Sequence, residues 1–111
     1  QSPSSAASDV YKRQELGAAH DGVLGFIGNG SRPNELANLR QKVGQQKMIW
    51  TPGVNLEVGD GEMGQRYGDP YAAILAGSDC IIVGSGIHGA KYPKVAAESY
   101  AQISWNALQD R

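Results

Sequence analysis

Three consecutive residues, Gly84, Ser85 and Gly86, follow directly after the apolar run at residues 80–83. Glycine lets the backbone approach a ligand closely, and successive backbone amides at such a turn can bind a phosphate group without help from side chains. The pattern therefore predicts a phosphate-binding turn at the end of a buried strand. A glycine turn that serves only for tight packing is the alternative interpretation.

Two further segments carry groups suited to the same ligand. Pro52 lies where a short apolar run gives way to a long loop, and proline there ends a strand at a defined angle. Later in that loop come Gln65, Arg66 and Tyr67, whose amide, guanidinium and phenol groups can all donate hydrogen bonds to phosphate oxygens. On spacing alone, a merely solvated loop explains these polar residues equally well.

Short apolar runs predict the strands that would position these groups, at residues 23–28, 48–51 and 79–83. The long loop, residues 53–68, contains many glycines and shows no periodicity. Loops of this length are uncommon in compact domains unless they serve a function.

A helix is predicted after each strand. Pro33 and Pro70 fall in the first turns of two helices, which Gly44 and Gly77 close, and a third helix runs from Ala96 to the C-terminus. The order β-α-β-α-β-α predicts an α/β fold with a parallel sheet. Both an open doubly wound sheet and part of a (β/α)8 barrel fit, since a complete barrel needs about 250 residues.

Composition narrows the classes of partner. The chain has 111 residues, is 41% hydrophobic, and has a formal net charge of −1, which is typical of a globular protein. Without a basic excess no nucleic-acid partner is expected, and without a run of about 18 apolar residues no membrane partner is expected. The single cysteine, Cys80, is expected to be buried; it allows no disulfide framework, which favours a cytoplasmic location.

Residues 1–14, QSPSSAASDVYKRQ, differ from the rest of the chain because they are small, polar and aperiodic. They resemble the translation of a sequencing adapter. The segment is therefore predicted to be a non-native scar or a disordered tail, and to carry no function. The domain itself is expected to span residues 15–111.

Four segments, VLGFIGNGSRP, WTPGVNL, GDGEMGQRYGDP and SDCIIVGSGI, occur in this order along the chain. They resemble the last three strand–loop units of the orotidine 5′-phosphate decarboxylase family. The resemblance implies that residues 15–111 are the C-terminal β-α-β-α-β-α portion of a (β/α)8 TIM barrel, incomplete at three of eight units. It also implies removal of CO2 from orotidine 5′-phosphate to give UMP in de novo pyrimidine biosynthesis, by a homodimer that needs no metal or organic cofactor.

The resemblance also implies roles for individual residues. Pro52 matches a proline that lies beside the pyrimidine ring. Gln65 matches a glutamine that bridges phosphate and pyrimidine, and Tyr67 matches a tyrosine that contacts phosphate in part of the family. Gly84 matches a glycine whose backbone amide meets the phosphate.

One residue of the expected substrate-binding set departs from the family. Ser85 stands where the family usually has arginine, so the motif reads VGSG in place of VGRG. Replacing a bidentate cation with a hydroxyl changes how phosphate is held. The Ser85 hydroxyl and amide could still donate, and Arg66 is a candidate for the missing charge.

No catalytic residue is expected within this chain. The family's D-x-K-x-x-D pattern does not occur in the 111 residues, so the resemblance places the catalytic lysines and aspartates upstream and implies an inactive fragment. Both a single-function decarboxylase and a fused UMP synthase fit as the parent. The alternatives are another barrel enzyme, such as a hexulose-phosphate synthase, and a noncatalytic phosphate-binding module.

Three conspicuous residues are assigned no function from the sequence. His88 follows the phosphate turn and is expected to be solvated or to cap a helix. Trp50 and Trp105 fall in a predicted strand and a predicted helix, where apolar packing is the expected role.

Overall fold

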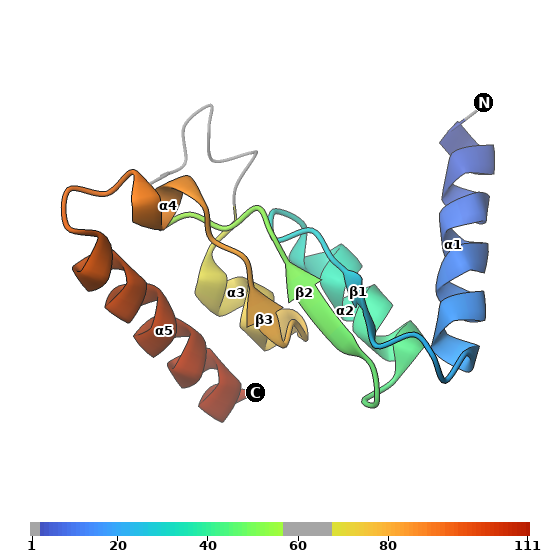
Figure 1. Cartoon of the computed structure of the whole chain (residues 1–111). Coiled ribbons are helices and arrows are strands. Elements are labelled where there is room, and N and C mark those ends of the chain that lie inside the picture. The colour runs from blue at the N-terminus through green and yellow to red at the C-terminus, as the bar shows by residue number, and fades with distance from the viewer. Residues whose placement is uncertain (1–2, 57–67) are drawn as a thin grey trace.

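The computed structural model describes residues 3–56 and 68–111 (Figure 1). The elements follow in the order α1 (Pro3–Ala19), β1 (Gly25–Ile27), α2 (Pro33–Val43), β2 (Met48–Thr51), α3 (Pro70–Ala76), β3 (Cys80–Ile81), α4 (Ser85–His88) and α5 (Pro93–Asp110). The alternation of strands and helices confirms the predicted α/β class. Within the described part of the chain, no helix combines the length and the apolar character needed to cross a membrane.

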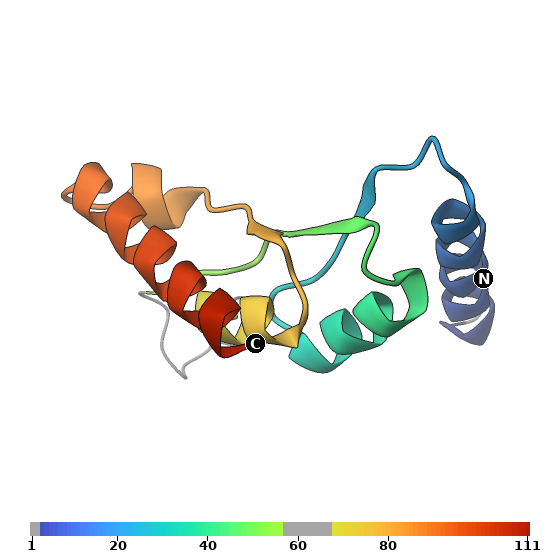
Figure 2. The same cartoon turned by 90° about the horizontal axis from the view of Figure 1, so that it is seen from below.

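The three strands form one parallel sheet in the order β1-β2-β3. Strand β2 is central: Ile49 pairs with Phe26 of β1, and Trp50 pairs with Cys80 of β3. Helices α2 and α3 lie along one face of this sheet, and helix α5 lies beside α3 (Figures 1 and 2). The parallel pairing confirms the arrangement that the alternating pattern predicted.

The core lies between the sheet and helix α2. The apolar residues Leu36, Leu39 and Val43 of α2 are buried, and they pack against Ile49 of β2, whose side chain is fully buried. Spacing at i, i+3 and i+7 puts all three residues on one face of the helix. The prolines predicted in the first turns do stand at the starts of α2 and α3.

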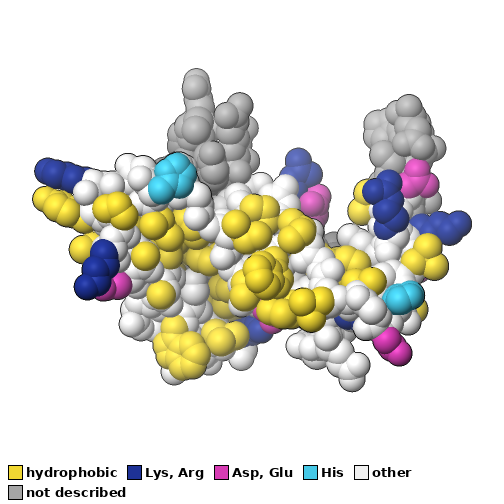
Figure 3. Space-filling view, in the orientation of Figure 1, with side chains coloured by type: hydrophobic (Ala, Val, Ile, Leu, Met, Phe, Trp, Pro, Cys, Tyr) yellow, Lys and Arg dark blue, Asp and Glu magenta, His cyan; other side chains and the backbone are white. Residues whose placement is uncertain are grey.

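The opposite face of the sheet is open. Figure 3 shows apolar side chains gathered over the strands on this face, and Trp50 is 41% and Ile82 43% exposed. Trp105 on α5 is 56% exposed, and Cys80 is only partly buried. The expectation that these tryptophans and the cysteine lie in a core is therefore wrong for this chain. Trp50 is exposed because no described element lies over that face of the sheet (Figure 2).

The N-terminal segment is helical where disorder or a foreign tail was expected. Helix α1 covers Pro3–Ala19, and Gly17 on it lies so close to Phe26 that an added Cβ would approach the phenyl ring to 2.8 Å. The Lys42 ammonium group of α2 lies over the Tyr11 ring of α1. The expectation of disorder is corrected by this helix. A helix fits either origin, so the foreign origin of residues 1–14 stays a prediction.

A hydrogen bond joins the start of α3 to the end of α5. The Tyr71 hydroxyl donates to Asp110 Oδ2 at 2.7 Å, and this bond is the main reason that the pKa of Tyr71 is raised above its usual value of 10.0. Because the folded pKa lies above the unfolded one, the stabilisation is complete below about pH 10 and is lost as the pH rises through the folded pKa.

We therefore expect Tyr71 to titrate later than a free tyrosine. The difference in tyrosinate absorbance between the wild-type chain and Tyr71→Phe isolates its titration. Asp110→Ala, which removes the acceptor, should bring the midpoint back towards about pH 10. An unchanged midpoint in that variant would contradict the assigned cause.

Candidate functional site

The carboxyl ends of β2 and β3 lie next to each other. The Ile82 N–H donates to the Thr51 carbonyl oxygen at 2.8 Å, so the pairing continues to the last residue of β2. Pro52 follows immediately on one side, and Gly84 follows two residues after Ile82 on the other. Parallel strands present their carboxyl ends at one edge of a sheet, and this brings two of the predicted site residues into adjacent strand exits.

The predicted phosphate turn leads directly into the short helix α4. Gly84 is the residue before the helix, and its carbonyl oxygen accepts the N–H groups of Ile87 at 3.0 Å and His88 at 3.1 Å. Helical geometry leaves the first amides of such a segment without an intrahelical acceptor. Gly84 and Ser85 are exposed, so their polar groups face solvent at this edge.

The two glycines of the turn have different environments. Among the described residues, only His88 Nε2 would lie near a Cβ added to Gly84, at 3.8 Å, so none of their contacts requires glycine there. A Cβ on Gly86 would lie 2.3 Å from the Tyr100 hydroxyl oxygen, so packing does require glycine at that position. Each glycine of the turn thus fits one of the two interpretations that the sequence left open. Gly86 is required for tight packing, and Gly84 leaves open space beside the backbone, as a phosphate-binding turn would need.

Pro52 is held against the exit of β1. Its carbonyl oxygen accepts the Gly30 N–H at 2.9 Å, and a Cβ on Gly30 would approach that oxygen and Val54 Cγ1 to 2.7 Å. Pro52 itself is partly buried. The close contact fixes where the chain leaves β2.

The two ends of the long loop are joined at what we call the loop neck, residues Gly53–Asn55 and Gly68. Val54 and Gly68 form a parallel bridge, the Gly68 N–H donates to the Gly53 oxygen at 2.6 Å, and the Asn55 N–H donates to the Gly68 oxygen at 3.0 Å. Gly68 also lies against Gly30, whose oxygen would be 1.7 Å from an added Cβ. The loop neck therefore lies at the strand edge that holds Pro52.

The remaining predicted contacts, Gln65 and Tyr67, lie outside the described residues, as does Arg66. The turn itself, Gly84–Gly86, carries no charged side chain. His88, which the sequence analysis set aside, lies beside Gly84. The signal that could have found it is its i, i+4 relation to Gly84, which places two residues on one face of a helical turn.

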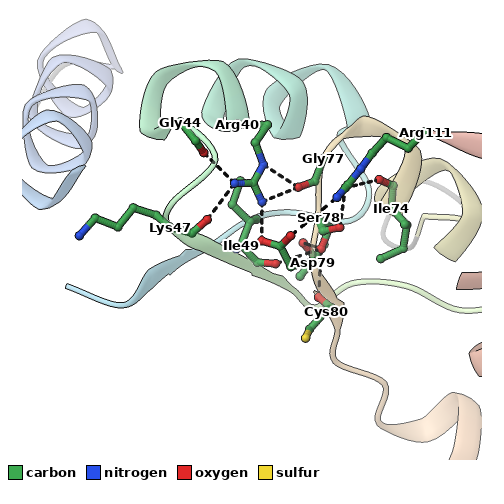
Figure 4. A network of polar contacts seen from close by, with 11 residues as sticks. Arg40, Gly44, Lys47, Ile49, Ile74, Gly77, Ser78, Asp79, Cys80 and Arg111 are labelled. Atoms are coloured by element: carbon green, nitrogen blue, oxygen red, sulfur yellow. Dashed lines mark hydrogen bonds and ion pairs between the residues drawn. The ribbon is translucent and has the colours of Figure 1, made fainter. Parts of the chain in front are cut away.

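The opposite edge of the sheet holds a polar network with a structural role (Figure 4). Arg40 of α2 is 9% exposed, and its guanidinium group donates to the carbonyl oxygens of Gly44, Lys47 and Gly77 at 2.8–2.9 Å. It also pairs with the Asp79 carboxylate. One side chain thus satisfies carbonyl groups at the ends of two helices and before β2.

Asp79 and Arg111 extend this network to the next strand and to α5. Asp79 Oδ2 accepts the Ile49 N–H at 2.8 Å, and Arg111 Nη1 donates to the carbonyl oxygens of Ile74 and Ser78 at 2.9 Å (Figure 4). Because these contacts lie at the amino ends of the strands, away from the glycine turn, they stabilise the fold. Among residues 3–56 and 68–111, no group of three or more His, Cys, Asp and Glu side chains could hold a metal ion.

A parallel α/β layer with glycines at the carboxyl edge of its strands fits part of a (β/α)8 barrel. The family model described as "Orotidine 5'-phosphate decarboxylase / HUMPS family" matches residues 2–100. The chain belongs to this family.

Named relatives agree with this assignment. An orotidine 5'-phosphate decarboxylase of Penicillium nalgiovense is 36% identical over 89 residues, which are 80% of this chain and 32% of that protein. The Schizosaccharomyces pombe decarboxylase is 38% identical over 94 residues, covering 82% of this chain and 32% of that protein. The chain thus spans about a third of the length of the curated relatives it matches.

A solved structure shows the same partial coverage. The orotidine 5'-phosphate decarboxylase of Lactobacillus acidophilus superposes with a TM-score of 0.70 at 26% identity, over 89% of this chain and 38% of that one. The described fold is therefore an incomplete portion of that enzyme's barrel, as predicted.

Proposed function

We propose that residues 15–111 are the C-terminal part of an orotidine 5′-phosphate decarboxylase and bind the phosphate and pyrimidine of its substrate. The observation that carries the proposal is the open space at Gly84, at a strand exit directly beside the exit that holds Pro52. A backbone that no side chain crowds can be approached closely by an anion.

In this proposal the exposed amides of Gly84 and Ser85 donate to the phosphate oxygens. The Ser85 hydroxyl adds a neutral donor where the family has a cation, which weakens the electrostatic part of the grip. Pro52 lies against the pyrimidine ring, and Gln65 and Tyr67 complete the contacts from the long loop. None of these groups forms a bond with the reacting carbon or transfers a proton to it.

The contribution of this part to the reaction is binding energy. Contacts to a non-reacting phosphate can be used to orient the reacting centre, so a phosphate grip raises the rate without taking part in the chemistry. The aspartate that lies against the departing carboxylate and the lysine that protonates the carbanion left on loss of CO2 are assigned to the part of the barrel outside this chain. The complete enzyme is proposed to act as a cytoplasmic homodimer without a cofactor.

The decarboxylase is favoured over a hexulose-phosphate synthase because the relatives at 36–38% identity carry the decarboxylase name. A self-contained noncatalytic module is disfavoured by the open sheet face. Exposed apolar side chains over a sheet with two unpaired edges are unusual for a complete soluble domain.

A chimera tests the proposal: residues 15–111 replace the segment of the Penicillium nalgiovense enzyme to which they align. We expect the chimera to decarboxylate orotidine 5′-phosphate. Gly84→Ala within it keeps the backbone amide but fills the space beside it with a methyl group, which should keep the phosphate from that amide and raise KM about tenfold, the effect of one lost charge-assisted contact. Steady-state kinetics provide the measurement, and thermal unfolding checks that both proteins are folded.

The companion variant Ser85→Arg should lower KM, because it returns a cation to the turn. A folded chimera without activity would refute the assignment to this enzyme. A KM that Gly84→Ala leaves unchanged would remove the turn from the phosphate site.

A further inference from the structure

Tyr100 of helix α5 contacts two segments of the proposed site, the exit of β2 and the glycine turn after β3. Its side chain is 3% exposed, and its hydroxyl oxygen accepts the Leu56 N–H at 2.8 Å. The same hydroxyl lies 3.4 Å from Asn55 Oδ1, to which it donates. One buried phenol therefore holds the chain where it leaves the β2 exit.

The other contact of this hydroxyl is with the glycine turn. A Cβ on Gly86 would lie 2.3 Å from Tyr100 Oη and 3.0 Å from Cζ, so the Gly86 backbone rests directly on the phenol. Gly86 is itself buried. The hydroxyl group is thus in contact with both strand exits at once.

We propose that Tyr100 is a positioning residue that sets the separation between the phosphate turn at Gly84–Gly86 and the exit segment Pro52–Leu56. This inference rests on the proposed function, because it assigns phosphate to the first segment and pyrimidine to the second. Tyr100 touches no ligand in this arrangement. It acts through Leu56 on one side and Gly86 on the other.

A change in this separation should affect the binding of ligands that contact both segments and leave the binding of smaller ligands unchanged. A nucleoside monophosphate must reach the turn and Pro52 together, so its binding depends on the distance between them. Inorganic phosphate needs only the turn. Loss of the Tyr100 hydroxyl removes its link to Leu56 and Asn55 at the end of the exit segment and leaves the turn's amides in place, so the two ligands should respond differently.

The test is a pair of titrations of the full chain, with UMP and with inorganic phosphate, followed through the amide NMR shifts of Gly84 and Gly86. Tyr100→Phe keeps the buried ring and removes only the hydroxyl. We expect UMP affinity to fall about fivefold to tenfold, the effect of one lost hydrogen bond, and phosphate affinity to change by less than about twofold.

Two further variants sharpen the result. Asn55→Ala removes the acceptor of the same hydroxyl, should also weaken UMP selectively, and serves as the test if Tyr100→Phe does not fold. Tyr71→Phe is the matched control, because it removes a phenol hydrogen bond to the other end of α5 and should change neither affinity.

The outcomes separate the inference from the function on which it rests. If the wild-type chain binds both ligands and the Tyr100→Phe and Asn55→Ala variants weaken neither, or weaken both equally, Tyr100 does not position the site while the phosphate turn stands. If the wild-type chain binds neither ligand, the proposed function fails and the inference with it.

Discussion

Replacing Arg40 with methionine should destabilise the folded chain by about 3 kcal/mol. The guanidinium group is 9% exposed and satisfies three backbone carbonyls and the Asp79 carboxylate, and methionine fills similar space without any donor. Removing one partner of a buried charged pair costs about 3–5 kcal/mol, because the other charge stays unpaired. The lower end applies here, since the Asp79 side chain is 30% exposed and can be partly hydrated.

The measurement is thermal and urea unfolding of the chain followed by circular dichroism. We expect Arg40→Met to lower the free energy of unfolding by about 3 kcal/mol, seen as a lower thermal midpoint and a lower urea midpoint. Arg32→Met is the matched control: Arg32 pairs with Glu35 at 3.1 Å in an exposed position, and such pairs contribute about 0–1 kcal/mol. Equal effects of the two substitutions would show that the Arg40 network does not hold the strands.

The second large effect is expected at the loop neck. Gly68→Ala would place a methyl group 1.7 Å from the Gly30 oxygen and 2.6 Å from its carbonyl carbon. Neither backbone can yield alone, because Gly30 donates to Pro52 and Gly68 donates to Gly53. Overpacking of this kind costs typically about 1–3 kcal/mol and more where backbone must move, and we expect about 3 kcal/mol here.

This substitution should also weaken UMP binding, because it pushes the exit of β2, which holds Pro52, away from the exit of β1. Gly44→Ala is the control for glycine replacement. Gly44 has φ 79° with nothing within 4 Å of an added Cβ, so alanine there brings only conformational strain, about 1 kcal/mol. A Gly68→Ala chain as stable as Gly44→Ala would mean that the neck is looser than its contacts indicate.

The three strands and helices α2 and α3 could be predicted from local signals in the sequence. Proline at the first turn and glycine after the last turn marked α2 and α3, and short apolar runs marked all three strands, because these signals are local along the chain. The motif residues also identified the family that the comparisons then showed. The residues of the proposed phosphate turn could therefore be named from the sequence before the fold was known.

Only the tertiary structure decided which of these residues meet. The contact of Tyr100 with Leu56 and the pairing of Arg40 with Asp79 join residues 44 and 39 positions apart, and neither leaves a trace in local periodicity. The helical conformation of residues 3–14 and the exposure of Trp50 were likewise missed. Whether a large apolar residue is buried depends on what lies over it, and here no described element covers that face of the sheet.

The turn at Gly84–Gly86 shows the division most clearly. Its glycines were visible in the sequence, but their two roles were not, because composition cannot say whether a neighbour lies beside a backbone atom. Packing against Tyr100 occupies the space at Gly86, and the space beside Gly84 is open. That difference, set by the position of α5, is what makes Gly84 the candidate for contact with phosphate.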